Sequence, residues 1–256
     1  MKHPANPAPP AAGRVFGERL PLAERYADLL VGVGVERGLV GPREAVRIWE
    51  RHLLNCAVIA SVMPPSAVVY DIGSGAGLPG LAIAIVRPDL EIVLIEPLKR
   101  RVDFLEEAVS VLELSRVRVQ RARAEELGPV RADVVTARAV APLSRLAQWC
   151  LPLVRPGGEL LALKGTQASA EVATAEPDLR RLGATAWSIE MVGGDLLDDP
   201  TTVVRIVAGP VPIGPDARTR RKPRRGAARP ASNPAAGSQN ECTPGSVAIS
   251  DPVGGR

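Results

Sequence analysis

Residues 68–80, VVYDIGSGAGLPG, join an apolar, β-branched run to an acid and then to four glycines in eight positions. Glycine lets the backbone adopt positive φ angles and approach a ligand closely. The spacing Gly75-x-Gly77-x-x-Gly80 is typical of a dinucleotide-binding loop. The spacing Gly73-x-Gly75-x-Gly77 behind Asp71 is instead typical of a loop that holds a nucleoside sulfonium. The first interpretation predicts hydride transfer and the second methyl transfer, and the loop alone does not decide between them.

Two carboxylates accompany this loop. An amino-acid tail carries an ammonium as well as a carboxylate, and Asp71 is placed to bind such an ammonium directly or through water. Glu96 closes the next apolar run, 25 residues after Asp71, where a carboxylate can accept both hydroxyls of a ribose. Because that position serves NAD and S-adenosylmethionine alike, the pattern predicts an adenosine-containing ligand without choosing one.

Alternating strands and helices are predicted to position these residues. Two amphipathic helical stretches, 20–39 and 43–62, precede the loop. Strands are then predicted at 67–72, 91–96, 116–121, 132–136, 158–163, 184–192 and 201–207, with helices at 79–86, 98–113, 143–153 and 169–181, and a turn at Pro156-Gly157-Gly158. Such alternation predicts a parallel sheet covered by helices on both faces. The last two strands lack a long helix between them, which predicts an antiparallel final hairpin and disfavours the six-stranded dinucleotide fold.

Composition sets the broad class of protein. The chain has 256 residues, of which 46% are hydrophobic, which fits one folded domain with appendages. No apolar run reaches the length of a membrane span, and the first residues lack the apolar region of a signal peptide. Cys56, Cys150 and Cys242 are widely spaced with no CxxC pair, which favours a reducing compartment and no zinc. We expect a cytoplasmic protein that binds no metal.

Charge is unevenly distributed along the chain. From residue 210 onward, eight basic residues face three acids, so this tail carries +5 and residues 1–209 carry −1 of the total +4. Its cluster RTRRKPRR is either a solvated tail or an auxiliary RNA-binding arm. We therefore predict a disordered N-terminus at 1–14, a helical segment at 15–66, a catalytic core at 67–209 and a disordered basic tail at 210–256.

Five stretches together resemble one protein family. WERHLLN at 49–55, the run from DIGSGAGLPG to RRVDFLEE, then RARAEEL, DVVTARAVAPL and LVRPGGELLALKG follow in the order of the RsmG (GidB) family and span about residues 45–166. The resemblance implies a Rossmann-like, seven-stranded class I methyltransferase fold with N-terminal helices and S-adenosyl-L-methionine as the methyl donor. It implies methyl transfer to N7 of a specific guanine of 16S ribosomal RNA, guanosine 527 in the conventional numbering.

The resemblance also assigns residues to the cofactor. Gly73 and Leu78, with Gly75, match the family's cofactor loop, and Ala124 and Glu125 match the pair beside the adenine. Glu96 takes the ribose position, where Asp is commoner, and Arg138 in TARAVAP matches an Arg at the mouth shared by cofactor and substrate. Cys56 stands where the family usually has Ser. TTVVRIVAG fits the family only loosely, and the basic tail is not a family feature.

RNA contacts are predicted at basic residues on the same rim. These are His52, Lys99, Arg100, Arg101, Arg123 and Lys164, each of which has a plainer alternative as a solvated charge or, for His52, a structural histidine. Guanine N7 carries a lone pair and no proton that must leave before attack, so we expect no general base. Alignment is the main catalytic device. Arg138 or Lys164 would hold the base through O6, or Arg138 would stack on it.

Two other functions remain open at this point. One is an NAD-dependent oxidoreductase that uses the literal GxGxxG, and the other is a non-catalytic RNA-binding protein with a vestigial pocket. Neither a Tyr-x-x-x-Lys pair nor a catalytic histidine pair supports the first, and the intact set Asp71, Gly73, Gly75 and Glu96 argues against the second. The expected partner is 16S ribosomal RNA or the small ribosomal subunit, with no membrane, for a monomeric enzyme.

Overall fold

The computed structural model describes residues 7–128 and 130–210. These lie within the first of two compact units, Met1–Ile213, and the second unit, Gly214–Arg256, lies outside the described residues. The predictions of a disordered start at 1–6 and of a disordered basic tail from 211 onward therefore fall on residues that are not described. None of the helices in the described part is long and apolar enough to cross a membrane.

Seven strands form one sheet in the order β3-β2-β1-β4-β5-β7-β6. They are β1 (Val68–Ile72), β2 (Glu91–Ile95), β3 (Val117–Gln120), β4 (Ala132–Arg138), β5 (Val154–Leu163), β6 (Ala184–Val192) and β7 (Thr201–Ala208). The first five run parallel, and β7 is antiparallel to both β5 and β6. The predicted strands and the antiparallel final hairpin are confirmed.

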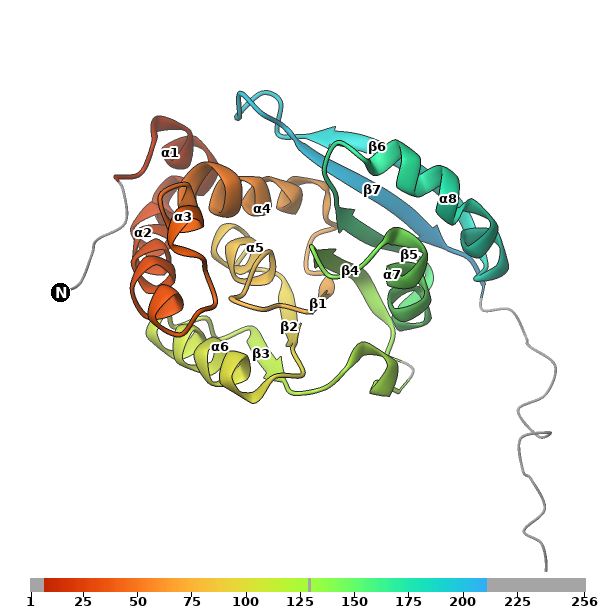
Figure 1. Cartoon of the computed structure of the whole chain (residues 1–256), viewed down its shortest axis with the longest axis horizontal. Helices are drawn as coiled ribbons and strands as arrows, with labels where there is room; N and C mark the ends of the chain where they lie inside the picture. Colours follow the sequence, from red (N-terminus) through yellow and green to blue (C-terminus); the bar gives the residue numbers. More distant parts are fainter. Residues whose placement is uncertain (1–6, 129, 211–256) are drawn as a thin grey trace, which may run out of the picture. The chain divides into compact units, whose positions relative to one another are not determined.

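Helices cover both faces of the sheet because successive strand residues point to opposite sides. Ile92 and Leu94 face a core shared with α5 (Gly80–Val86), α6 (Lys99–Val111) and the N-terminal helices. Val93 and Ile95 face the other core, shared with α7 (Leu143–Cys150) and α8 (Ala168–Arg181). Figure 1 shows α1–α5 gathered on one side and α7 and α8 on the other. The four predicted core helices are confirmed.

The N-terminal helical segment packs into the first core. It contains α1 (Pro10–Phe16), α2 (Leu20–Leu29), α3 (Pro42–Ala45) and α4 (Asn55–Ala57), with wider π-helical turns at Leu30–Gly34 and Ile48–Leu54 and tighter 3₁₀ turns at Gly17–Arg19 and Val58–Val62. The prediction of disorder over 1–14 is wrong for residues 10–14. Pro at the first turn suits a helix start, and Phe16 packs edge-on against Trp49 with ring centroids 6.3 Å apart.

The predicted turn at Pro156-Gly157-Gly158 lies inside a strand. Val154 already pairs with Ala132, and Glu159 pairs with Val134, so the three turn residues form an irregularity within β5. A Cβ on Gly158 would lie 2.7 Å from the carbonyl oxygen of Asp133. Glycine therefore allows the two backbones to approach there, and the strand begins four residues earlier than predicted.

Candidate functional site

The glycine loop lies between the carboxyl end of β1 and α5. Gly73, Gly75 and Gly77 all have positive φ angles, of +71°, +58° and +96°. The amides of Gly73 and Ser74 donate to the carbonyl of Ile95 at 2.9 and 3.1 Å, which fixes the loop to the end of β2. Tyr26 from α2 donates to the carbonyl of Ala76 at 2.8 Å. Burial raises the pKa of Tyr26 well above its usual value, so this phenol keeps the proton that it donates.

Asp71 lies beneath the loop and is fully buried. Its Oδ2 accepts a hydrogen bond from the amide of Gly80 at 3.1 Å, and its Oδ1 has no partner. Burial raises the pKa of Asp71 to about 7, against hydrogen bonding and the charge of Arg138, which lower it. The side chain therefore holds the start of α5, and its contact with a cofactor ammonium stays a prediction.

Glu96 ties the glycine loop to the residues that follow β2. Only 1% of its surface is exposed, and its Oε2 accepts from the amide of Gly75 at 3.0 Å while Oε1 accepts from the amide of Leu98 at 3.0 Å. Arg101 NH1 lies 3.5 Å from Oε2. The carboxylate is thus held in one orientation at the end of the second strand.

A cavity of about 440 Å³, the Glu96 cavity, opens beside this carboxylate. Its lining includes Gly73, Ile95, Glu96, Leu98, Arg101, Arg123, Ala124, Glu125, Ala139, Val140, Arg145 and Trp149. The guanidinium of Arg145 lies 4.9 Å from the ring centroid of Trp149. The predicted residues Gly73, Glu96, Ala124 and Glu125 are therefore brought together around one mainly apolar space of the size that small ligands occupy.

A smaller cavity of about 230 Å³, the His52 cavity, lies on the other side of the glycine loop. Its lining includes Gly41, Glu44, His52, Gly73, Gly75, Leu78, Arg101, Arg138 and Ala139. The predicted residues Gly75 and Leu78 lie here. Gly73, Arg101 and Ala139 line both spaces, so the two cavities adjoin at the loop.

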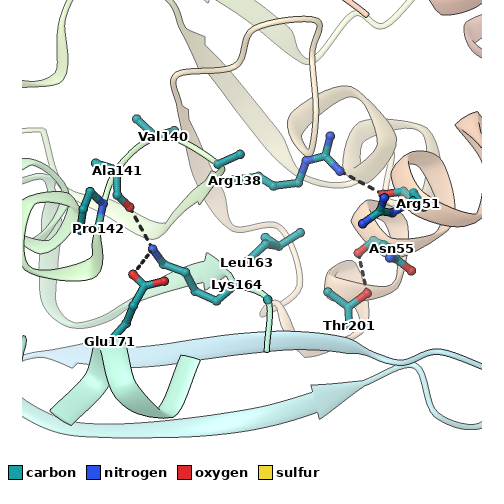
Figure 2. Close-up of a pocket in the computed structure, with 12 residues that line it drawn as sticks. Arg51, Asn55, Arg138, Val140, Ala141, Pro142, Leu163, Lys164, Glu171 and Thr201 are labelled. Carbon is teal, nitrogen blue, oxygen red and sulfur yellow. Dashed lines mark hydrogen bonds and ion pairs between the residues drawn. The ribbon is translucent and has the colours of Figure 1, made fainter. Parts of the chain in front are cut away.

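A third cavity of about 660 Å³, the Lys164 cavity, lies beyond the ends of β4 and β5. It is lined by Arg51, Asn55, Arg138, Val140, Lys164 and their neighbours (Figure 2). Ala139, with a φ angle of +56°, lines all three cavities. The loop at residues 138–141 is therefore the wall between the Glu96 cavity and the Lys164 cavity.

Arg138 ends β4 and is held by the N-terminal helical segment. Its NH1 donates to the carbonyl of Arg51 at 3.1 Å, and its NH2 lies 2.8 Å from His52 Nδ1. The Nε2 of His52 lies 2.9 Å from Glu44 Oε2. The pKa of His52 is lowered by burial and by the charge of Arg138, whereas Glu44 opposes this shift. Both ring nitrogens are engaged within the protein, which favours an intramolecular role for His52 over direct contact with RNA.

Lys164 directly follows β5 and is mostly buried, with 10% of its side chain exposed. Its Nζ donates to the carbonyl of Ala141 at 2.9 Å and lies 2.7 Å from Glu171 Oε2 (Figure 2). The same carboxylate oxygen accepts from the amide of Leu143 at 2.9 Å. Lys164 lines the predicted rim, and its ammonium is occupied in holding the 138–141 loop against α8.

The remaining basic candidates diverge. Lys99 pairs with Asp103 one turn along α6, and Arg100 is exposed. Arg101 turns toward Glu96 and lines two of the cavities. Arg123 borders the Glu96 cavity and lies 3.9 Å from Glu126. The three consecutive cations at 99–101 therefore do not form one patch.

Several residues that line the Glu96 and Lys164 cavities were not predicted from the sequence as separate candidates. They are Arg51, Asn55, Val140, Arg145 and Trp149. Arg51 and Asn55 lie within the WERHLLN stretch and Val140 within TARAVAP, so their neighbours offered a signal, whereas Arg145 and Trp149 are ordinary residues of an amphipathic helix. Within the described part of the chain, no group of three or more His, Cys, Asp or Glu side chains is arranged to hold a metal ion.

Comparison with known proteins places the chain in a family. The family model described as "GidB: rRNA small subunit methyltransferase G" matches residues 19–197. A protein of Thermobifida fusca named ribosomal RNA small subunit methyltransferase G is 54% identical over 217 residues, covering 84% of this chain and 92% of the relative. One of Salinispora arenicola with the same name is 52% identical over 244 residues, covering 88% and 100%. These matches decide against the dinucleotide oxidoreductase.

One solved structure has a similar architecture. The chain matches the crystal structure of P. horikoshii TYW2 in complex with MeSAdo with a TM-score of 0.50 and 15% identity, over 61% of this chain and 62% of that one. This likeness supports the fold alone, and the predicted Rossmann-like methyltransferase fold is confirmed. The predicted resemblance is confirmed by the family model and the relatives together. The chain belongs to the rRNA small subunit methyltransferase G family.

Proposed function

We propose that this enzyme transfers the methyl group of S-adenosyl-L-methionine to N7 of one guanine of 16S ribosomal RNA in the small ribosomal subunit. One observation carries the proposal. The Glu96 cavity of about 440 Å³, which we assign to the adenosine, and the Lys164 cavity of about 660 Å³, which we assign to the base, share the wall formed by Ala139 and Val140. A methyl donor and an acceptor base on the two sides of this wall would meet at its edge.

The residues around the Glu96 cavity fit the donor. Glu96 offers a fixed carboxylate to the ribose hydroxyls, Ala124 and Glu125 border the adenine side, and the Trp149 ring with the Arg145 guanidinium over it offers flat surfaces. Gly73 and Gly75 keep the loop bare for the methionine part, and the unpartnered, buried Oδ1 of Asp71 lies just beneath it. When bound there, S-adenosyl-L-methionine supplies an electrophilic methyl group.

The Lys164 cavity suits a guanine that has left its stack. Arg138 and Arg51 offer hydrogen-bond donors for O6, and Asn55 offers a side chain that can both donate and accept. N7 attacks with its own lone pair, so the protein need not remove a proton before the new bond forms. Arg138 and Val140 would set the angle of approach, and alignment of this kind contributes about 7–11 kcal/mol to lowering a barrier.

We further propose that the chain acts as a monomer in the cytoplasm. The substrate that we propose belongs to the ribosome, so the enzyme must act where ribosomes are found. Lys164 acts in this scheme by holding the 138–141 loop through Ala141 and Glu171.

Methylation of defined ribosomal particles tests the proposal. Small subunits from cells that lack this protein are incubated with the enzyme and methyl-labelled S-adenosylmethionine, and 7-methylguanine in the 16S RNA is located by cleavage at the modified base. We expect one modified guanine with full dependence on the enzyme. Label in another base position, or in protein, would contradict the proposed reaction. Transfer to naked RNA in parallel shows which form of the substrate is used.

A further inference from the structure

We propose that His52 is a positioning residue: its Nδ1 lone pair holds the guanidinium of Arg138, and Glu44 holds the imidazole from the other side. The inference rests on the proposed function, because Arg138 owes its importance to its place between the His52 cavity and the Lys164 cavity. It concerns Glu44–His52–Arg138, a chain of three side chains from α3, the Ile48–Leu54 turn and β4.

Hydrogen-bond chemistry leaves one arrangement of protons. A guanidinium only donates and is always charged, so the 2.8 Å contact from Arg138 NH2 requires a bare Nδ1 on His52. The neutral ring then carries its proton on Nε2, which points at Glu44 Oε2 across 2.9 Å. A carboxylate only accepts, so the two contacts agree on the neutral Nε2–H form.

The surroundings of His52 favour this neutral form. Only 15% of its side chain is exposed. It faces Glu44 from α3, Arg138 from β4, Arg51 of its own turn and, across the His52 cavity, Arg101 from α6. Burial and the charge of Arg138 lower the pKa of His52, and Glu44 raises it. Burial and the charges of Arg138 and Arg51, opposed by Glu44 alone, make a second proton on this mostly buried ring unfavourable.

Arg138 gains two anchors from the same turn. NH1 reaches the carbonyl of Arg51 at 3.1 Å, and NH2 reaches the ring of the next residue, His52. The guanidinium plane is therefore fixed by two donors in a fork, an orientation that a single contact would leave free to rotate. The N-terminal helical segment thus takes part in the site by orienting a residue of the sheet.

A proton on Nδ1 of His52 would break its hydrogen bond with Arg138. The protonated ring would present a donor and a positive charge to Arg138, and the guanidinium would have to turn away. Because the pKa of His52 lies below its usual value in the folded protein, the chain is intact above that pKa and is lost as the pH falls through it. The fall in turnover at low pH that protonation of His52 causes should therefore disappear when His52 is replaced by a residue that does not titrate.

Two isosteric variants separate the two ring nitrogens. The amide oxygen of an Asn side chain takes the place of Nδ1, whereas the amide of a Gln side chain takes the place of Nε2. His52→Asn keeps an acceptor for Arg138, and we expect its kcat to stay within about fivefold of wild type. His52→Gln keeps a donor for Glu44 and loses that acceptor, and we expect a loss in kcat of tenfold or more with little change in the Kd for S-adenosylmethionine. Equal losses in both variants would overturn the proposal.

Nuclear magnetic resonance of the imidazole nitrogens tests the Glu44–His52–Arg138 hydrogen bonds without any RNA. The chain has two histidines, His3 and His52, so the signals are assigned by one substitution. At neutral pH we expect the Nε2–H form for His52. Arg138→Met should raise the pKa of His52 and Glu44→Gln should lower it, while the matched control Glu176→Gln, which breaks an exposed pair with Arg180, should leave it unchanged. An Nδ1–H form, or no shift in Arg138→Met, would overturn the proposal.

The two sets of results distinguish the inference from the function on which it rests. A wild-type enzyme that methylates small subunits while His52→Gln turns over normally would leave the function in place and remove the positioning role. Conversely, the resonance data could show the Nε2–H form of His52 and the opposite pKa shifts in Arg138→Met and Glu44→Gln, while the wild-type enzyme modifies no guanine N7. That result would support the positioning role of His52 and overturn the proposed reaction.

Discussion

A Cβ placed on Gly73 would lie 2.9 Å from Cγ2 of Val140, so the glycine loop after β1 and the loop after β4 touch across the ends of their strands. The contact brings the two walls of the Glu96 cavity together at the point where the Lys164 cavity begins. Parallel neighbouring strands end at the same edge of the sheet, which is why two segments 67 residues apart in the sequence can meet there.

Gly73→Ala should weaken cofactor binding more than Gly75→Ala does. Both positions have positive φ angles, which cost an alanine about 1–2 kcal/mol. Only Gly73 also meets a side chain, since the nearest atom to a Cβ on Gly75 is 3.8 Å away. Calorimetry with S-adenosylmethionine should show at least a tenfold rise in Kd for Gly73→Ala, partly recovered in the double variant with Val140→Ala. Similar affinities for the two single variants would remove this contact from the cofactor site.

Asp71→Asn should change how stability depends on pH. Burial raises the pKa of Asp71 from 3.8 to about 7, so the native state binds more protons than the unfolded state between about pH 4 and pH 7. This group therefore makes the wild-type free energy of unfolding fall as pH rises through that window. Urea unfolding at several pH values should show the asparagine variant gaining on wild type from pH 5 to pH 8. A difference in the free energy of unfolding that stays constant with pH would mean that the pKa of Asp71 is not raised.

Strand and helix positions could be predicted from the sequence because each obeys a local pattern. Ile92 to Ile95 are continuous apolar residues of a strand buried on both faces, and the glycines before α5 mark its loop. The helix at Pro10–Phe16 could not be predicted in this way, because it is stabilised by contact with Trp49, which is distant in the sequence. A local pattern of Pro, Ala and Gly is typical of a loop, and only the distant contact outweighs it.

The positions of the candidate residues in the fold were easier to predict than their hydrogen-bond partners. Residues at the carboxyl ends of parallel strands must gather at one edge, and the structure places Gly73 and Glu96 in one cavity there and Arg138 and Lys164 in the adjoining one. The engagement of Lys164 by Glu171 depends on how α8 packs, and no spacing in the sequence encodes that distance. The sequence therefore predicts where a basic residue lies, whereas its role depends on the acidic residues that the fold brings near it.

Lys164→Met should reduce turnover without changing the salt dependence of RNA binding. Its ammonium is held by Ala141 and Glu171, so no phosphate contact is lost. Each phosphate contact contributes about 0.7–0.9 to the log–log salt slope. Glu171→Gln should act in the same direction on kcat, because it loosens the same loop. A salt slope that falls by about one contact in Lys164→Met, with normal turnover in Glu171→Gln, would make Lys164 an RNA-binding residue instead.

Arg138→Ala should damage turnover much more than Arg121→Ala, although each removes one positive charge. Arg138 is fixed by Arg51 and His52 and lines two cavities, whereas Arg121 is exposed beyond β3, where its Nε donates to the carbonyl of Pro97 at 3.2 Å. Alignment is the device that the site offers, and a displacement of about 1 Å costs on the order of a hundredfold in rate.

Single-turnover methylation of small subunits measures the chemical step apart from product release. We expect a loss on the order of a hundredfold for Arg138→Ala and less than about threefold for Arg121→Ala, with RNA affinity falling by similar amounts in both. Arg138→Lys keeps the charge and loses the fork that reaches Arg51 and His52 together, so it should resemble the alanine variant in rate more than wild type. Equal and small effects of Arg138→Ala and Arg121→Ala would leave Arg138 a charge on the rim with no part in alignment.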